Sequence, residues 1–131
     1  MKYKDLFDKF DTEGKLALPG LESDFSGIPW SRHPVFEGVE LKHVITAKQT
    51  GGEFSFHLVR IAPDRKIGKH VHETQLETHE VISGSGVCNN DGTEITYEPG
   101  VISILPANAP HEVTAGEEGL YLFAKFMPAL N

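Results

Sequence analysis

An all-β fold, either a sandwich or a barrel of antiparallel strands, is what the sequence predicts for most of this chain. Three observations support it. From about residue 35 onward, short runs of β-branched and aromatic residues recur at regular spacing, and clusters of Gly, Pro, Asn and Asp separate them. Only residues 3–10 have the spacing of an amphipathic helix. The length of 131 residues suits one domain.

The N-terminal segment is expected to form a short helix followed by an arm. Apolar residues at positions i, i+3, i+4 and i+7 would face the main body, namely Tyr3, Leu6, Phe7 and Phe10. Residues 11–34 are rich in Gly, Pro and Ser, which indicates an ordered arm rather than a domain. Trp30 in this arm is expected to dock on the main body or on a partner subunit.

The remaining chain divides into strands and turns. The expected strands are 39–46, 54–61, a segment holding His70 and His72, 77–83, 93–97, 101–105, 111–114 and 120–127. The expected turns are 49–52, 63–64, 84–86, 89–92, 98–100 and 117–118. The turn at 89–92, with sequence Asn-Asn-Asp-Gly, is the clearest, because Asn, Asp and Gly tolerate positive φ.

Charge and composition argue against several classes of function. The net charge is −7 and no basic stripe is visible, so we expect no nucleic-acid partner. Apolar stretches fall far short of the roughly 20 residues that a membrane span requires, and no signal peptide is evident. Cys88 is the single cysteine, which excludes an internal disulfide and fits a cytoplasmic location.

Three histidines and one glutamate have spacings that suit a single metal ion. His70 and His72 are two apart, so on an extended segment both point to the same face. Glu77 begins the next strand, and His111 arrives on a separate strand much later in the chain. Neutral imidazoles with one carboxylate suit Fe, Mn, Ni, Co, Cu or Zn and leave positions open for water or substrate.

The same residues resemble the first motif of the cupin family. That motif is Gly, five residues, His-x-His, three or four residues, Glu, six residues and Gly. Here it reads Asp64, five residues, His70-x-His72, four residues, Glu77, six residues and Gly84. Asp64 replaces the first Gly, and Asp can adopt the same left-handed turn conformation.

A second cupin motif follows after a short interval. The family pattern is Gly, five residues, Pro-x-Gly, two residues, His, three residues and Asn. Here it reads Gly100, five residues, Pro106-x-Asn108, two residues, His111, three residues and Ala115. Asn108 replaces a turn glycine and Ala115 replaces the terminal Asn, but neither position is a ligand.

The resemblance covers about residues 36–127 and implies a small jelly-roll barrel, also called a double-stranded β-helix. It divides the chain into residues 1–34, a helix and arm, and residues 35–131, a single barrel domain. It implies one divalent transition metal per chain, Fe, Mn, Ni or Zn. Small cupins usually form dimers, so a homodimer is expected.

Cupins include dioxygenases, decarboxylases, lyases, isomerases and binding proteins, so the resemblance leaves the activity open. Our first hypothesis is a metal-dependent dioxygenase acting on a small organic substrate. The alternatives are a non-catalytic protein that binds or senses a small molecule, and a metal-dependent lyase or isomerase.

Other histidines are ranked by their position on the predicted strands. His79 lies two residues after Glu77 and should face the barrel interior, so it is our candidate catalytic acid or base, with a supporting contact to the ligands or fifth-ligand role as alternatives. His57 lies in an alternating run and could approach the same pocket. His33 and His43 have no spacing signal and are expected at the surface.

Overall fold

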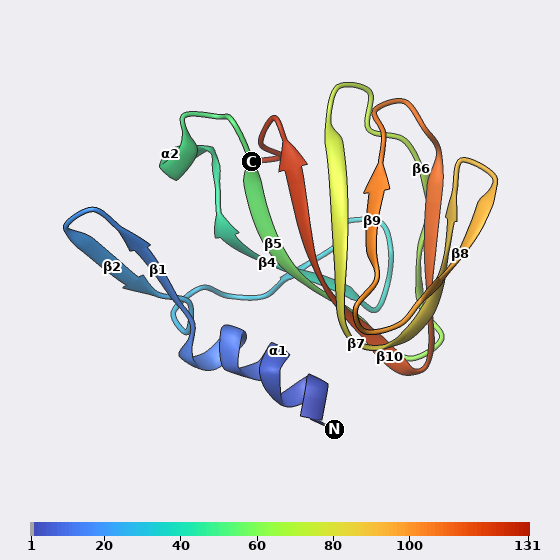
Figure 1. Ribbon diagram of the computed structural model, residues 1–131, viewed down its shortest axis with the longest axis horizontal. Helices are drawn as coiled ribbons and strands as arrows, with labels where there is room; N and C mark the ends of the chain where they lie inside the picture. The colour runs from blue at the N-terminus through green and yellow to red at the C-terminus, as the bar shows by residue number, and fades with distance from the viewer. Residues whose placement is uncertain (1) are drawn as a thin grey trace.

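The computed structural model describes residues 2–131 and confirms a mainly β chain with a short N-terminal helix (Figure 1). The two helices are α1 (Lys2–Glu13) and α2 (Ala47–Thr50). The strands are β1 (Lys15–Leu18), β2 (Leu21–Asp24), β3 (Ser31–Arg32), β4 (Val39–Ile45), β5 (Ser55–Ile61), β6 (Lys66–His70), β7 (Leu76–Asn90), β8 (Thr93–Tyr97), β9 (Ile102–Leu105) and β10 (His111–Met127). Within residues 2–131, no helix is long and apolar enough to cross a membrane.

Two long antiparallel strands, β7 and β10, organise the jelly-roll barrel. The main sheet has the order β3-β4-β5-β10-β7-β8, while β6 pairs with β10 and β9 pairs with β7. The first part of β10 pairs with β6 and the end of β7, and its second part pairs with β5 and the start of β7. The same two strands therefore contribute to both halves of the barrel.

The predicted turn at 84–86 is wrong, because these residues lie inside the continuous strand β7. The register to β10 shifts between Ala115 and Leu120, which pair with Gly86 and Gly84. Gly84 has a φ of 83°, and a Cβ there would clash with the carbonyl oxygen of Gly119. The glycines thus form an irregularity that bends the paired strands, where the sequence suggested a strand end. The predicted turn at 117–118 is likewise part of β10.

A second difference concerns the turn expected at 49–52. Residues Ala47–Thr50 form the short helix α2, so residues 3–10 are not the only helical segment. Thr46 and Gln49 form a capping box at the start of α2, and Gly51 ends it with a φ of 64°. The expected turn is therefore the C-terminal end of α2, and the residues that cap this helix, Thr46, Gln49 and Gly51, could have been recognised in the sequence.

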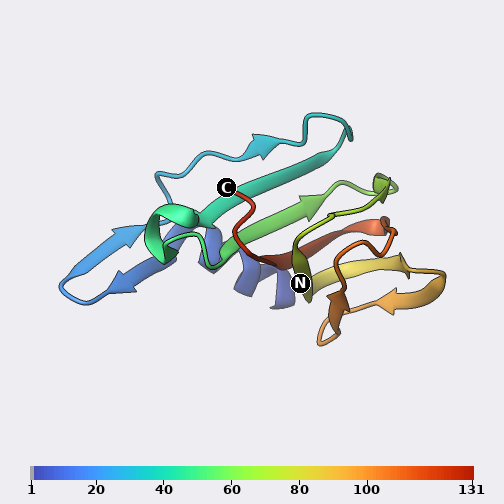
Figure 2. The same cartoon turned by 90° about the horizontal axis from the view of Figure 1, so that it is seen from above.

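The N-terminal arm contains a hairpin that the sequence analysis did not identify. Strands β1 and β2 pair with each other and project from the sheet (Figure 2). Further along the arm, Trp30 docks on α1 and the main sheet. Its ring stacks on Phe7, its Nε1 donates to Asp11 at 3.1 Å, and the guanidinium of Arg60 lies 3.9 Å from its centroid.

The part of the chain that the structure describes forms two apolar cores. One fills the barrel, and its buried members include Val39, Val59, Ile61, Val81, Tyr97, Leu105, Val113, Leu120, Leu122 and Phe126. The other lies between the outer face of the sheet and the N-terminal segment, and contains Phe7, Phe25, Val44, Leu58 and Phe123. Alternate residues of β5 thus enter different cores, as strand periodicity requires.

Candidate metal centre

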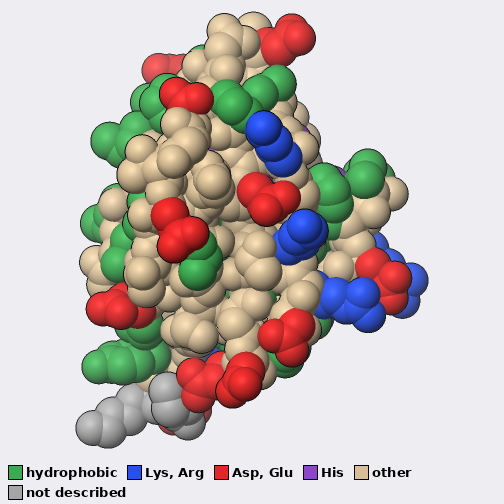
Figure 3. Space-filling model, turned by 90° about the vertical axis from the view of Figure 1, so that its right-hand side faces the viewer, with side chains coloured by type: hydrophobic (Ala, Val, Ile, Leu, Met, Phe, Trp, Pro, Cys, Tyr) green, Lys and Arg blue, Asp and Glu red, His purple; other side chains and the backbone are tan. Residues whose placement is uncertain are grey.

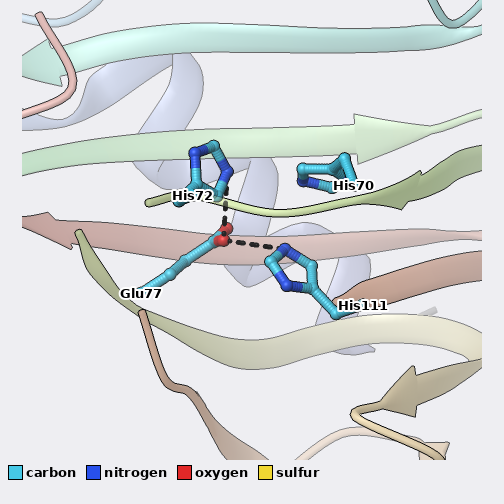
Figure 4. A group of neighbouring side chains, drawn as sticks. All are labelled: His70, His72, Glu77 and His111. Carbon is cyan, nitrogen blue, oxygen red and sulfur yellow. Dashed lines mark ion pairs between the residues drawn. The ribbon is translucent and has the colours of Figure 1, made fainter. Parts of the chain in front are cut away.

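The four residues singled out by spacing converge inside the barrel. His70 ends β6, His72 follows it, Glu77 lies near the start of β7, and His111 begins β10. Each offers a ligand atom, and these atoms all lie within 4.8 Å of one another (Figure 4). The pairing of β6 with β10 places His70 directly beside His111. The cluster could therefore hold one metal ion.

Backbone carbonyl groups orient two of the imidazole rings. Nδ1 of His70 lies 2.7 Å from the carbonyl oxygen of Gly68, and Nδ1 of His111 lies 3.1 Å from that of Ala109. A carbonyl oxygen only accepts, so Nδ1 must carry the proton in both rings. The lone pair of each Nε2 is then available to a metal, which is the usual arrangement around metal-binding histidines.

Glu77 lies at the centre of the cluster and is 5% exposed. Its Oε1 is 3.2 Å from Nε2 of His111 and 3.6 Å from Nε2 of His72, the two contacts drawn in Figure 4. Neither Oε1 of Glu77 nor Nε2 of His111 has a hydrogen-bond partner of good geometry, although both are buried. Unsatisfied buried polar atoms are costly, and a cation between them would satisfy both. The donor set therefore fits a metal.

Burial and mutual contacts shift the pKa values of the candidate ligands, and for three of them, His70, His72 and Glu77, the shift favours the metal-binding state. Burial lowers the pKa of His70 and of His72, which favours neutral imidazoles. Burial by itself would raise the pKa of Glu77, but its contacts with His79 and His111 outweigh burial and hold that pKa well below its usual range. The contact with Glu77 also raises the pKa of His111, against the effect of burial.

His79 faces the barrel interior, as its position two residues after Glu77 predicted. Its Nε2 lies 2.7 Å from Oε2 of Glu77, and its Nδ1 lies 2.8 Å from the hydroxyl of Tyr97. Burial raises the pKa of Tyr97, so its hydroxyl stays protonated and donates to Nδ1. His79 then carries its proton on Nε2 and donates to the carboxylate. Both of its nitrogens are engaged.

For the remaining histidines, the position predicted from the sequence agrees with the structure at His57 but not at His33 and His43. His57 is fully buried inside the barrel, on the face that the alternating pattern of β5 predicted. The surface prediction is wrong for His33 and His43, which are partly buried and line the cavity beside the cluster. Val39, Leu41 and His43 alternate along β4 toward the interior, so strand periodicity could have placed His43 correctly.

A cavity of about 280 Å³ opens beside the four candidate ligands. Its walls are mainly apolar and include Leu41, Val59, Ile67, Val113, Leu122, Ala124 and Phe126. It also contacts the polar residues Ser31, Arg32, His33, His43 and His79. An apolar pocket with a few convergent polar groups is the usual form of a small-molecule site.

Fold and site together define a jelly-roll barrel with a candidate metal centre in its interior. The model of the cupin domain family matches residues 57–124, just over half of the chain. The chain belongs to the cupin family. No curated protein matches it in sequence.

Solved structures share the fold. KdgF from Halomonas sp. is 19% identical, with 79% of this chain and 88% of that chain covered and a TM-score of 0.69. A predicted oxalate decarboxylase from Thermotoga maritima is 21% identical, with 79% and 95% covered and a TM-score of 0.72. The polyketide cyclase RemF from Streptomyces resistomycificus is 19% identical, with 79% and 75% covered and a TM-score of 0.67. At these identities the likeness concerns the fold alone.

Proposed function

We propose that His70, His72, Glu77 and His111 hold one divalent transition metal ion, Fe, Mn, Ni or Zn, and that the protein is a metal-dependent enzyme of dioxygenase type. Its substrate would be a small organic molecule in the adjacent cavity. The observation that carries the proposal is the pair of unsatisfied buried atoms, Oε1 of Glu77 and Nε2 of His111, among two further imidazoles.

The arrangement of the ligands supports a reactive centre. Four side chains approach from the barrel wall, and the cavity adjoins the same group, so positions remain for substrate. When bound, the metal would supply Lewis acidity and, as Fe or Mn, a redox couple. Apolar side chains such as Leu122 and Phe126 would exclude water and strengthen the interactions of bound groups.

His79 is better suited to a positioning role than to direct proton transfer with a substrate. Its two nitrogens contact Glu77 and Tyr97, and its side chain is almost completely buried. These contacts fix one carboxylate oxygen of Glu77 and leave the other for the metal. Direct acid or base catalysis by His79 stays a prediction that would require this hydrogen-bond chain to rearrange.

Oxygen uptake tests the reaction type. Protein loaded with Fe(II) is expected to consume dioxygen when it meets its substrate in a panel of small organic acids and carbonyl compounds, whereas Zn-loaded protein is not. Glu77→Gln should abolish uptake, while Glu73→Gln, an exposed glutamate four residues away, should not change it. Turnover of a substrate by Zn-loaded protein without oxygen would reject the dioxygenase proposal.

A lyase or isomerase is the second candidate. The observation that favours it is the buried chain from Tyr97 through His79 to Glu77, which can move a proton next to the metal position. Anaerobic turnover that survives in Zn-loaded protein and is lost in Tyr97→Phe would support this candidate.

We also propose that the protein forms a homodimer. Ile102 and Ile104 of β9 are 71% and 61% exposed, and among the described residues β9 pairs with β7 alone. An exposed apolar edge strand favours pairing with another chain. In Figure 3, acidic side chains are spread over the face, whereas the basic side chains lie along one side of it. Analytical ultracentrifugation should give a dimer for the wild type and a monomer for Ile102→Glu combined with Ile104→Glu; a wild-type monomer would reject it.

A further inference from the structure

One row of side chains crosses the barrel interior on four adjacent strands. In the register of the main sheet, His43 of β4 lies opposite His57 of β5. On β10, Ala124 lies opposite both His57 and His79. Residues that lie opposite one another in antiparallel strands share a face of the sheet, and His57 and His79 are buried inside the barrel. His43 therefore faces the interior too, three strand spacings away from His79, the residue that contacts Glu77.

The middle of this row is open. Ala124 carries only a methyl group, and His43, Ala124 and His79 all line the cavity beside the four candidate ligands. Neighbouring strands lie about 4.8 Å apart, so the Cα atoms of His43 and His79 are separated by up to roughly 14 Å. His43 thus stands on the side of the cavity away from Glu77, toward which a ligand bound at the metal centre would extend.

A chain of buried hydrogen bonds holds the ring of His43. Its Nδ1 lies 2.7 Å from Nδ1 of His57, whose Nε2 lies 2.8 Å from Oγ of Ser55. The backbone N–H of Leu130 donates to the same Oγ at 2.9 Å. Ser55 and His57 are completely buried, so their donors and acceptors must be satisfied within this chain of contacts.

The direction of these hydrogen bonds follows from the protons available. Burial, and to a lesser extent the neighbouring His43, lowers the pKa of His57 to about 4, so its ring is neutral and carries one proton. If that proton were on Nε2 of His57, the buried hydroxyl of Ser55 would have no acceptor. The hydroxyl therefore donates to Nε2, and Nδ1 of His57 donates to Nδ1 of His43. His43, whose pKa burial also lowers, must then carry its proton on Nε2.

Nε2 of His43 is a donor without a hydrogen-bond partner in the part of the chain that the structure describes, and it remains accessible to solvent. The other two cavity imidazoles outside the ligand set offer no lone pair. Nδ1 of His33 accepts from the backbone N–H groups of Val35 and Phe36, and both nitrogens of His79 are engaged. These imidazoles therefore give the cavity N–H donors and no acceptor.

We propose that His43 is a specificity-determining residue, whose Nε2–H donates a hydrogen bond to a carbonyl-type oxygen on the part of the substrate remote from the metal. This inference rests on the proposed function and narrows its substrate class to small molecules with a metal-binding group at one end and an oxygen acceptor at the other. His57 and Ser55 are positioning residues for His43. A carbonyl oxygen placed beside Leu41 and Val59 without this donor would lose its hydrogen bonds to water and gain none.

Calorimetry on the Zn-loaded full chain tests this hydrogen bond. The probes are heptanohydroxamate, which anchors to the metal, and its isomeric keto derivatives, which carry one carbonyl group at the fourth, fifth or sixth carbon. His43→Met removes the donor and should lower the affinity of at least one keto probe about tenfold, while changing that of heptanohydroxamate less than about twofold.

Two further variants complete the design. In His43→Gln the side-chain amide can accept from His57 and donate to the probe, so the affinity of the same keto probe should fall less than about threefold. The control is Val35→Ala, an exposed residue that does not line this cavity, which should change the affinity of every probe less than about twofold.

Two results would overturn the proposal. One is that no keto probe loses more affinity in His43→Met than in Val35→Ala; the other is an equal loss in His43→Met and His43→Gln. Zinc content is measured on the same samples. A wild type without zinc, or without affinity for heptanohydroxamate, would contradict the proposed metal centre. Normal zinc and normal heptanohydroxamate binding with no effect on the keto probes would contradict only the role of His43.

The positioning role of His57 and Ser55 has its own readout in the imidazole ¹H–¹⁵N correlations. We expect the proton on Nε2 in His43 and on Nδ1 in His57. The keto probe that responds to His43→Met should shift the Nε2–H signal of His43 downfield, whereas heptanohydroxamate should not. In Ser55→Ala the hydroxyl donor is absent, so His57 can move its proton to Nε2 and His43 should shift toward the Nδ1–H form. The reverse tautomers in the wild type, or no change in Ser55→Ala, would overturn the positioning role.

Discussion

Nε2 of His79 lies 2.7 Å from Oε2 of Glu77, and this contact leaves Oε1 as the carboxylate oxygen that faces the imidazoles of His72 and His111. The hydroxyl of Tyr97 holds the other side of the His79 ring at 2.8 Å. Two buried side chains, His79 and Tyr97, thus determine the orientation of the central candidate ligand.

His79→Ala should therefore weaken metal binding without removing a ligand. Loss of a hydrogen-bonded group behind a metal ligand typically lowers affinity about 10–100-fold. Competition with a chromogenic chelator measures this change. The matched control is Glu80→Gln, the next residue along β7, which pairs with Lys125 on the opposite face. Equal affinity in His79→Ala and Glu80→Gln would contradict the positioning role.

Asp11→Ala should destabilise the attachment of α1 to the barrel. The ammonium of Lys42, whose side chain is 2% exposed, lies 2.6 Å from Oδ1 of Asp11, which also accepts from Trp30. Removing one partner of a buried ion pair costs about 3–5 kcal/mol. Urea denaturation should show this loss, whereas Asp8→Ala, which removes a partly exposed pair with Lys4 within α1, should cost less than about 1 kcal/mol. Similar losses in both variants would contradict the prediction.

Gly84→Ala should be far more harmful than Gly92→Ala. Both glycines have positive φ, 83° and 87°, so both substitutions carry backbone strain of about 1 kcal/mol. Only at Gly84 does the added Cβ meet a backbone atom, the carbonyl oxygen of Gly119; at Gly92 nothing lies within 4 Å. We expect an additional loss of at least about 2 kcal/mol at Gly84 by urea denaturation. Equal losses would show that β7 and β10 separate easily there.

His57 should make the free energy of unfolding depend on pH. Its pKa is about 4 in the folded protein and near 6.5 in the unfolded chain. Between these values the unfolded chain binds a proton that the folded protein does not, so stability falls as pH decreases from about 6.5 to about 4. The slope for one such group is at most ~1.4 kcal/mol per pH unit.

The measurement is urea denaturation at several pH values, with a chelator present so that metal release does not contribute. His57→Gln lacks this group and should show a shallower slope over the same range. Parallel slopes for His57→Gln and the wild type would mean that His57 titrates normally in the folded protein.

The candidate ligands were predictable because strand periodicity and motif spacing are local properties. His70 and His72 share a face at a spacing of two, and the motif offsets identified Glu77 and His111 before any contact was known. The predicted turn at 84–86 was wrong because glycine is compatible with more than one backbone structure. Gly84 allows either a turn or a bulge, and only the pairing of β7 with β10 decides between them.

The hydrogen bond between His43 and His57 was not predictable from local sequence. His43 has no motif, and its partner His57 is 14 residues away on the adjacent strand. This contact arises from the register of β4 and β5.

Metal content per chain tests the central claim most directly. Protein purified without chelators or an affinity tag and analysed by mass spectrometry should contain about one divalent transition metal ion per chain. The ion should be absent from His72→Ala and Glu77→Gln and present in Glu73→Gln, while circular dichroism shows the same β fold in all four proteins. A wild type that binds no metal even after incubation with Fe, Mn, Ni or Zn, or variants that retain it, would contradict the assignment.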